Sequence, residues 1–426
     1  MKNYNKNGEK SKTTLHYKLL FLIFCLIFVS TLFICIKNTN FYLPKLFNDI
    51  HYRIKLKDKS IFYNMIYPRY NHTATKLDNG NIIFIGGGSN FSEIYDSKNG
   101  VFIKGPKCKY DRYMHNTVKL PDGNLLIFGG HDETNQNSKI KEIELYDWKK
   151  QKFSVLMELN RQLFCPKSAI LNNGNILVIS SKISGDETFS GLPEIINLKS
   201  KTSQVITNFP ENFCSYFEES IIPIKVDNNI IFYKLKMNSD TKNLIWDGKN
   251  FQKINGLRFF DKTWKIILPI GNNKIFYSKS FFKNKNAYNQ VGIFDLKTNI
   301  NKTLLNIQRS SEYNSFIPAN ITEIKNSNII IAGGKTNTPK SKTKYSQDVY
   351  LYNQNNVRKI GLLYNKTLIN FSISDLENGK LLICGGRTEN NQHGFKQYKA
   401  TNKCQIMSYI EESVGWVLTQ QRNTNE

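Results

Sequence analysis

Arginine and histidine recur at a fixed spacing in two segments of the chain. Of all the residues in the sequence, these are the best suited by type and spacing to bind a ligand. Arg69 is followed by His72, and Arg112 by His115. Further arginines and histidines stand at comparable places: Arg161, Arg258, Arg309, His131, Arg387 and His393. The planar guanidinium of arginine binds carboxylates and phosphates through two hydrogen bonds, so a group of these residues predicts a site for an acidic ligand.

The two arginine–histidine pairs belong to a longer repeat. The segment 69–87, RYNHTATKLDNGNIIFIGG, recurs at 112–130 as RYMHNTVKLPDGNLLIFGG. Each copy predicts an alternating strand, an Asp/Asn-Gly turn that favours a tight hairpin, and a continuous apolar strand of the kind buried between neighbours. Later copies have their turn glycines at Gly174 and Gly379, and three units with eroded turns lie between them, around residues 229, 273 and 327.

Each unit continues with two more predicted strands. The third strands read SEIYD, IELYD, EIINL, NLIWD, VGIFD, VYLYN and CQIMSY, and more polar fourth strands follow, such as VFIKG and VRKIG. This pattern resembles the kelch repeat, in the form found in bacterial proteins related to the galactose-oxidase propeller, and it covers residues 69 to about 420. The resemblance implies an all-β propeller of about seven four-stranded antiparallel blades. Because units three to five lack the double glycine of the others, six or eight blades stay open as alternatives.

In such a blade the start of the first strand and the end of the second lie on the same face of the disc. The arginines and histidines should therefore gather on the face that carries the long loops, where binding sites are often found. Arg69, His72, Arg112 and His115 occur in register with the repeat, which favours a structural role, bonding backbone carbonyls between blades. The candidates for contact with a ligand are Arg112, His115, His131, Arg387 and His393, of which the last two and His131 break the register.

The N-terminal part of the chain predicts a membrane anchor. Residues 19–36 contain 18 consecutive uncharged residues, which span roughly 27 Å as a helix, about one hydrocarbon core. The five lysines before this segment place the N-terminus in the cytoplasm. A cleaved signal peptide is the alternative, although no small-x-small cleavage motif follows the segment.

This gives the expected domain organisation. We predict a basic cytoplasmic tail at 1–18, a single-pass signal anchor at 19–36, a stalk at 37–66, a propeller at 67–421 and a short tail at 422–426. The propeller would then lie outside the cytoplasm, in the periplasm if the source is Gram-negative, as a monomer.

Charge and cysteine content narrow the possible partners. The net charge is +25, and residues beyond position 60 still hold 48 basic and 31 acidic groups. This excess is spread along the chain with no basic helix, zinc spacing or RNA-binding motif, so no nucleic-acid partner is expected.

Cys384 and Cys404 end the second strand and begin the third strand of the last unit, so we expect them to face each other and form a disulfide. No cysteine–histidine cluster indicates a metal, and no cofactor is predicted.

The leading functional hypothesis is therefore a membrane-anchored module that binds a protein or a glycan on its loop-bearing face, without catalysis. The alternative is an enzyme similar to the kelch-propeller sugar epimerases and mutarotases, with Arg387 holding the carboxylate of an acidic sugar and carboxylates from Asp132, Glu133 or Glu389 as acid and base. Copper chemistry like that of galactose oxidase is disfavoured, because only four of the six histidines lie in the propeller and none forms a pair beside tyrosines.

Overall fold

The computed structural model describes residues 60–410 except for 133–139, 181–190, 211–220, 235–243, 254–264, 271–272, 284–285, 299, 310–314, 318–319, 338–343, 354–355 and 393–394. The chain divides into two compact units, Met1–Asp58 and Lys59–Glu426. The first unit contains the predicted anchor at 19–36 and lies outside the described residues. Within the described part of the second unit, no helix is long and apolar enough to cross a membrane.

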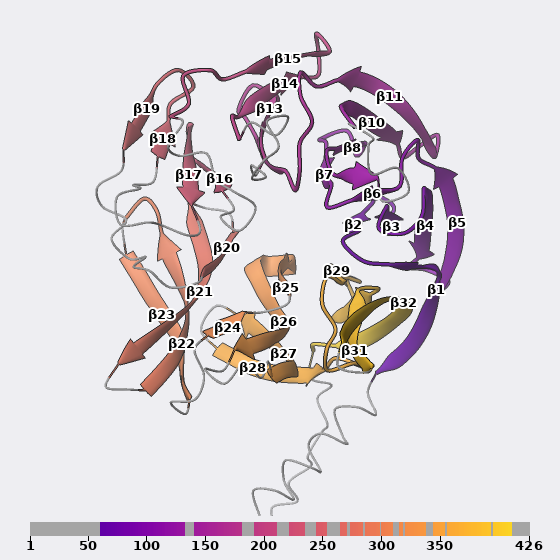
Figure 1. Ribbon diagram of the computed structural model, residues 1–426, viewed down its shortest axis with the longest axis vertical. Helices are drawn as coiled ribbons and strands as arrows, with labels where there is room; N and C mark the ends of the chain where they lie inside the picture. Colours follow the sequence, from indigo (N-terminus) through magenta and orange to yellow (C-terminus); the bar gives the residue numbers. More distant parts are fainter. Residues whose placement is uncertain are drawn as a thin grey trace, which may run out of the picture. The chain divides into compact units, whose positions relative to one another are not determined.

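The described strands form seven antiparallel blades around a common centre (Figure 1), which confirms the predicted propeller. Blade 1 consists of β2 (Thr73–Lys76), β3 (Ile82–Ile85), β4 (Phe91–Asp96) and β5 (Val101–Lys107), and blade 2 of β7 (Asn116–Lys119), β8 (Leu125–Phe128), β10 (Glu142–Asp147) and β11 (Lys152–Glu158). Blade 3 consists of β12 (Lys167–Ile170), β13 (Ile176–Ile179), β14 (Glu194–Asn197) and β15 (Thr202–Val205). Blade 4 consists of β16 (Ile221–Val226), β17 (Asn229–Lys234), β18 (Leu244–Trp246) and β19 (Phe251–Lys253).

Blades 5 to 7 follow the same order with additions at their ends. Blade 5 consists of β20 (Lys265–Pro269), β21 (Lys274–Lys283), β22 (Asn286–Asp295) and β23 (Ile300–Arg309). In blade 6, β24 (Ser315–Ile317) and β25 (Asn320–Ile324) both pair with β26 (Asn328–Asn337), which β27 (Lys344–Asn353) and β28 (Asn356–Leu362) follow. Blade 7 consists of β29 (Ser372–Asp375), β30 (Lys380–Cys384), β32 (Phe395–Ser408) and β1 (Ile61–Arg69). A short 3-10 helix, η2 (Lys325–Ser327), joins β25 to β26, and β31 (Arg387–Gln392) pairs with β32. The short strands β6 (Arg112–Tyr113) and β9 (His131–Asp132) form a separate pair.

The core lies between neighbouring blades. All four residues of β3, β8 and β13 are buried, as the apolar runs in the sequence predict. One cluster joins Ile83 of blade 1 to Leu125 of blade 2, and the next joins Leu126 of blade 2 to Ile176 of blade 3. Burying such a side chain contributes about 1.5–3 kcal/mol, so each blade is stabilised chiefly by its neighbours.

The double glycine after the second strand allows a close approach between blades. Gly86 and Gly87 have φ of +67° and +74°, a backbone region that favours glycine. A Cβ at Gly86 would overlap the carbonyl oxygen of Arg112, which accepts a hydrogen bond of 2.9 Å from the Gly87 amide. The chain entering blade 2 therefore lies directly against the end of β3.

The ring is closed by the first and last segments of the propeller. β1 is the outermost strand of blade 7, with Ile61 opposite Ile406 and Tyr63 opposite Cys404 of β32. Residues 61 to 66 thus belong to a blade, and the expected propeller start at residue 67 is corrected to Ile61. This pairing gives β32 a partner on its outer side, so the last blade has four strands like the others.

Cys384 and Cys404 are Cα partners across β30 and β32 and form a disulfide. Both are fully buried. The bridge closes a loop with a sequence separation of 20, which stabilises the fold by about 3 kcal/mol when the loss of freedom in the unfolded chain is counted. It reinforces the blade on which ring closure depends.

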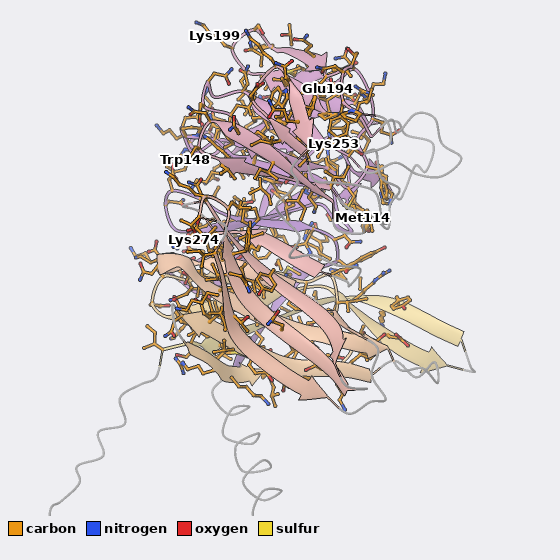
Figure 2. The ribbon with its side chains drawn as sticks, turned by 90° about the vertical axis from the view of Figure 1, so that its left-hand side faces the viewer. Met114, Trp148, Glu194, Lys199, Lys253 and Lys274 are labelled. Carbon is orange, nitrogen blue, oxygen red and sulfur yellow. A yellow bond between two sulfur atoms is a disulfide. The ribbon has the colours of Figure 1, made fainter. Side chains whose placement is uncertain are left out.

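The two faces of the disc differ in their connections. Met114, in the connection that enters blade 2, lies on one side in Figure 2, and Trp148 and Lys274, beside hairpin turns, lie on the other. The arginine–histidine pairs, the double glycines and the β31–β32 hairpin belong to the first side. We call this side the loop-bearing face and the opposite side the turn-bearing face.

Candidate ligand-binding face

The two repeated arginines are buried ion-pair partners. Nε of Arg69 lies 2.8 Å from Glu93, and Nε of Arg112 lies 3.0 Å from Glu144. Their side chains are at most 2% exposed. Nη1 of each arginine also donates to the carbonyl of the first glycine of the double-glycine pair, at 2.6 Å to Gly86 for Arg69. Each arginine therefore fastens the start of a blade to the third strand of that same blade, and we assign Arg112 to the scaffold rather than to a ligand.

The glutamates in these pairs were missed by sequence reasoning. They occupy the same position in three consecutive third strands, SEIYD, IELYD and EIINL, and this repetition was the signal that could have identified them. In the third blade Arg161 lies 3.7 Å from Glu194. In the last blade the position holds Gln405, whose amide oxygen accepts from the Tyr364 amide at 3.0 Å.

The two repeated histidines connect neighbouring blades. Nδ1 of His115 donates to the Arg112 carbonyl at 3.1 Å, so its Nε2 accepts from the Thr73 hydroxyl of blade 1 at 2.9 Å. His72 hydrogen-bonds Ser372 of blade 7 at 2.9 Å. Burial, reinforced by the nearby arginine charges, lowers the pKa of both histidines to about 3. They are neutral hydrogen-bonding groups of the scaffold, and His115 is assigned there instead of to a ligand site.

Arg387 has a different environment. It begins β31 on the loop-bearing face, and its guanidinium carbon lies 4.5 Å from the ring centre of Tyr398 and 5.4 Å from that of Tyr70. The residue is partly exposed, although its Nε is buried and has no hydrogen-bond partner. Two aromatic rings thus hold the cation, and the partial exposure of the residue keeps the guanidinium within reach of a ligand.

The aromatic contacts continue across three more connections. The ring of Tyr70 lies 5.0 Å from Tyr113, which lies 5.8 Å from His131, which lies 5.5 Å from Phe164. The last two contacts are stacked, at interplanar angles of 30° and 28°. We call the six residues the aromatic arc: Tyr398, Arg387, Tyr70, Tyr113, His131 and Phe164.

The arc is open at one end. Tyr398 is 46% exposed, whereas Tyr113 is 6% exposed. His131, a predicted candidate, is half-buried between Tyr113 and Phe164. A ligand approaching from solvent therefore meets Tyr398 first, because the other five residues are half-buried or buried.

A carboxyl group lies beside Arg387. Glu389 is two residues further along β31, on the same side of the strand, and it accepts a hydrogen bond from the hydroxyl of Tyr345 on β27. Burial and this hydrogen bond raise the pKa of Tyr345 above its ordinary value. Tyr345 is therefore protonated at neutral pH.

The other predicted residues fall elsewhere. Asp132 is paired with Arg112 in the β6–β9 ladder and is 9% exposed, so it is enclosed. Glu133 and His393 lie outside the described residues. Within the described part of the chain, no group of three histidine, cysteine or acidic side chains could hold a metal.

Comparison with known proteins agrees with a kelch-like β-propeller. A fungal alcohol oxidase of the AA5 family, solved in complex with copper, is similar in structure, with a TM-score of 0.56 and 13% identity over 82% of this chain and 76% of the oxidase. The protein YjhT is also similar, with a TM-score of 0.45 and 14% identity over 82% of this chain and 97% of its own. At these identities the likeness concerns the fold alone. No family model and no curated protein matches the sequence.

Proposed function

We propose that this protein is a membrane-anchored propeller that binds a carboxylate-bearing glycan at the Arg387 end of the aromatic arc, outside the cytoplasm. The environment of Arg387 carries the proposal: it is a partly exposed arginine whose guanidinium lies against two tyrosine rings. The uncharged segment at 19–36 and the lysines before it support the anchor.

The arrangement suits the two halves of an acidic sugar. The guanidinium edge of Arg387 pairs with the carboxylate, and the exposed ring of Tyr398 packs against the apolar face of the pyranose. The positive charge of the propeller raises the local concentration of acidic glycans near this face.

Replacing Arg387 with alanine is expected to weaken binding of sialic or uronic acids roughly 10- to 100-fold, because a charged hydrogen bond is worth about 1.5–3 kcal/mol. The measurement is calorimetric titration of the full chain in detergent with acidic sugars and their neutral counterparts. Arg387→Lys keeps the charge but loses the planar fork, and an intermediate affinity is expected.

Lys399→Ala is the matched control, because Lys399 is an exposed cation next to Tyr398 on the same strand. It should leave the affinity unchanged. Equal affinity for neutral and acidic sugars would contradict the role of Arg387. Absence of binding by every sugar would overturn the proposal and leave a protein ligand as the alternative.

The hydrogen bond between Tyr345 and Glu389 favours a second candidate function, mutarotation of the same acidic sugar. Glu389 would take the proton of the anomeric hydroxyl while Tyr345 gives its proton to the ring oxygen, and ring closure reverses both transfers. We expect Glu389→Gln to abolish accelerated anomer exchange, followed by NMR, while binding persists. A wild-type exchange rate equal to that in buffer would eliminate this candidate and leave the binding function intact.

A further inference from the structure

Exposed apolar side chains are concentrated on one part of the outer edge of the propeller. β1, β5 and β11 are the outermost strands of blades 7, 1 and 2, and they follow one another along the perimeter of the disc (Figure 1). Of the ten large hydrophobic residues that are exposed in the described part of the chain, six lie on these three strands. We call them the apolar rim, and each is between 44% and 52% exposed: Ile61, Phe62, Ile66, Val101, Ile103 and Val155.

The three strands form a continuous surface, because β1 contacts β5 and β5 contacts β11. Phe102 of β5 packs in the cluster shared by blades 7 and 1, so its neighbours Val101 and Ile103 point toward blade 2. Phe153 of β11 packs in the cluster shared by blades 1 and 2, so Val155, two residues further on, points toward blade 1. These exposed aliphatic side chains therefore line the boundary between the two blades from both sides.

The charges beside the apolar rim are positive. β1 and β5 contain no acidic residue, and Lys104 and Lys107 are exposed on β5, whereas Arg69 of β1 is buried. Nζ of Lys104 lies 3.7 Å from the ring centre of Phe91, and the Phe91 ring stacks on that of Tyr67 at 6.4 Å. Exposed aliphatic side chains together with tyrosines and lysines are typical of surfaces that bind the interface of an anionic bilayer.

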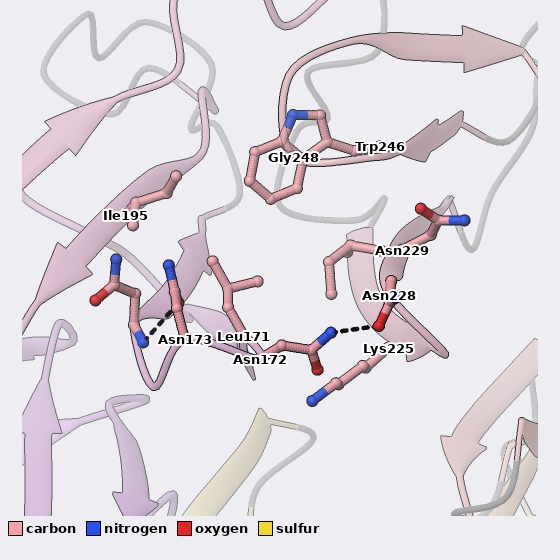
Figure 3. Close-up of a pocket in the computed structure, with 11 residues that line it drawn as sticks. Leu171, Asn172, Asn173, Ile195, Lys225, Asn228, Asn229, Trp246 and Gly248 are labelled. Carbon is pink, nitrogen blue, oxygen red and sulfur yellow. Dashed lines mark hydrogen bonds between the residues drawn. The ribbon is translucent and has the colours of Figure 1, made fainter.

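The outer strands of the next two blades are polar. Blade 3 exposes Thr202 and Gln204 on β15, and blade 4 exposes Gln252 on β19. The pocket between these two blades is also lined by amides, among them Asn172 and Asn228, which are joined by a hydrogen bond of 2.7 Å (Figure 3). Polar residues are usual on the edge of a sheet, because an exposed apolar edge promotes association. The apolar rim departs from this pattern, which indicates a partner that covers it.

The chain enters the propeller through the same surface. β1 begins at Ile61, and residues 37–60 connect it to the uncharged segment 19–36, the proposed anchor. This connection reaches at most about 80 Å when fully extended. A tether of this length keeps the local concentration of the propeller at the bilayer high, so that even a weak contact is populated. A lipid surface is therefore the partner that the apolar rim meets most often.

We infer that the apolar rim lies on the surface of an anionic lipid bilayer. This inference rests on the proposed membrane anchor. The exposed aliphatic side chains insert between the lipid headgroups, and Lys104 and Lys107 extend to the phosphates. The disc then stands on its edge, and the loop-bearing face with the aromatic arc stays accessible to a ligand beside the bilayer.

Quenching by brominated lipids tests the contact directly. The full chain is reconstituted in vesicles of phosphatidylcholine and phosphatidylglycerol that carry bromine on their acyl chains, and the signal of its four native tryptophans is subtracted. Ile103→Trp reports on the apolar rim, and Gln204→Trp, also at an exposed position of an outermost strand, is the matched control. We expect the fluorescence added by Ile103→Trp to be quenched and that added by Gln204→Trp to be unchanged.

Two double variants in the Ile103→Trp background test the chemistry of the contact. Val101→Thr/Val155→Thr keeps the branched shape of the side chains but makes them polar, and Lys104→Gln/Lys107→Gln removes the charges. Each should reduce the quenching, and vesicles of phosphatidylcholine alone should do the same. Melting temperature establishes that the variants are folded. Quenching that both double variants leave unchanged would overturn the inference.

Flotation of the wild-type chain with vesicles at high salt reports separately on the anchor. If the chain floats but Ile103→Trp is quenched no more than Gln204→Trp, the inference fails and the anchor stands. A dimer seen by light scattering in that case would assign the apolar rim to a second copy of this chain. If the chain does not float, the anchor and the inference fail together.

Discussion

Replacing Arg112 with methionine is expected to lower the free energy of unfolding by about 3–5 kcal/mol, because the substitution leaves Glu144 as a buried carboxylate without a counter-ion. The two side chains are 1% and 2% exposed, and Nε of Arg112 lies 3.0 Å from the carboxylate. The carbonyls of Gly129 and Glu142 also lose their donors, at 2.9 and 2.8 Å. Chemical denaturation of the full chain in detergent measures the change.

Two comparisons isolate the buried charge as the cause. Adding Glu144→Gln to the Arg112 variant removes the buried charge but keeps an acceptor for the Lys109 amide. Part of the lost stability should therefore be restored. Lys109→Met breaks a pair with Glu142 in which the lysine is 49% exposed, and a loss below about 1 kcal/mol is expected. If the Arg112 and Lys109 variants lose equal stability, burial is not what makes the repeated arginine important.

The blades could be predicted from the sequence because their signals are local. A tight turn needs positive φ, and Gly80, Gly123, Gly174 and Gly379 adopt it. The apolar runs after these turns are the buried second strands. The closing strand β1 has no such signal, since most of its residues are exposed or half-buried and its partner lies more than 330 residues away.

The candidate site was predictable only in part, for the same reason. Register with the repeat distinguishes Arg112 and His115, which are buried, from Arg387 and His131, which are half-buried. Tyr70 and Tyr113 directly follow the repeated arginines, so the alignment contained a third of the aromatic arc. Phe164 and Tyr398 come from connections that show no sequence pattern. They join the arc only because blades 7, 1, 2 and 3 pack side by side in the folded protein.

Acidification from pH 7 to pH 5 is expected to lower the free energy of unfolding by about 4 kcal/mol, through His72 and His115. Their pKa in the folded protein is about 3, against 6.5 for an ordinary histidine. Between these values the unfolded chain binds more protons than the folded one, so stability falls as pH falls. At pH 5 each histidine lowers the free energy of unfolding by about 2 kcal/mol, because one pKa unit corresponds to about 1.36 kcal/mol. Urea denaturation at pH 7, 6 and 5 measures the slope.

The double variant His72→Gln/His115→Gln tests the origin of this slope. Glutamine donates and accepts hydrogen bonds as a neutral histidine does, but it does not titrate, so stability should become nearly independent of pH in this range. The paired carboxyl of Glu142 does not confuse the result, because its pKa is lowered to about 2 and its contribution is lost only as pH falls below about 4.5. A double variant with the wild-type slope would place the titrating groups elsewhere. Both histidines bridge blades, His72 to blade 7 and His115 to blade 1, so the expected loss at acid pH is a loss of contact between blades rather than within them.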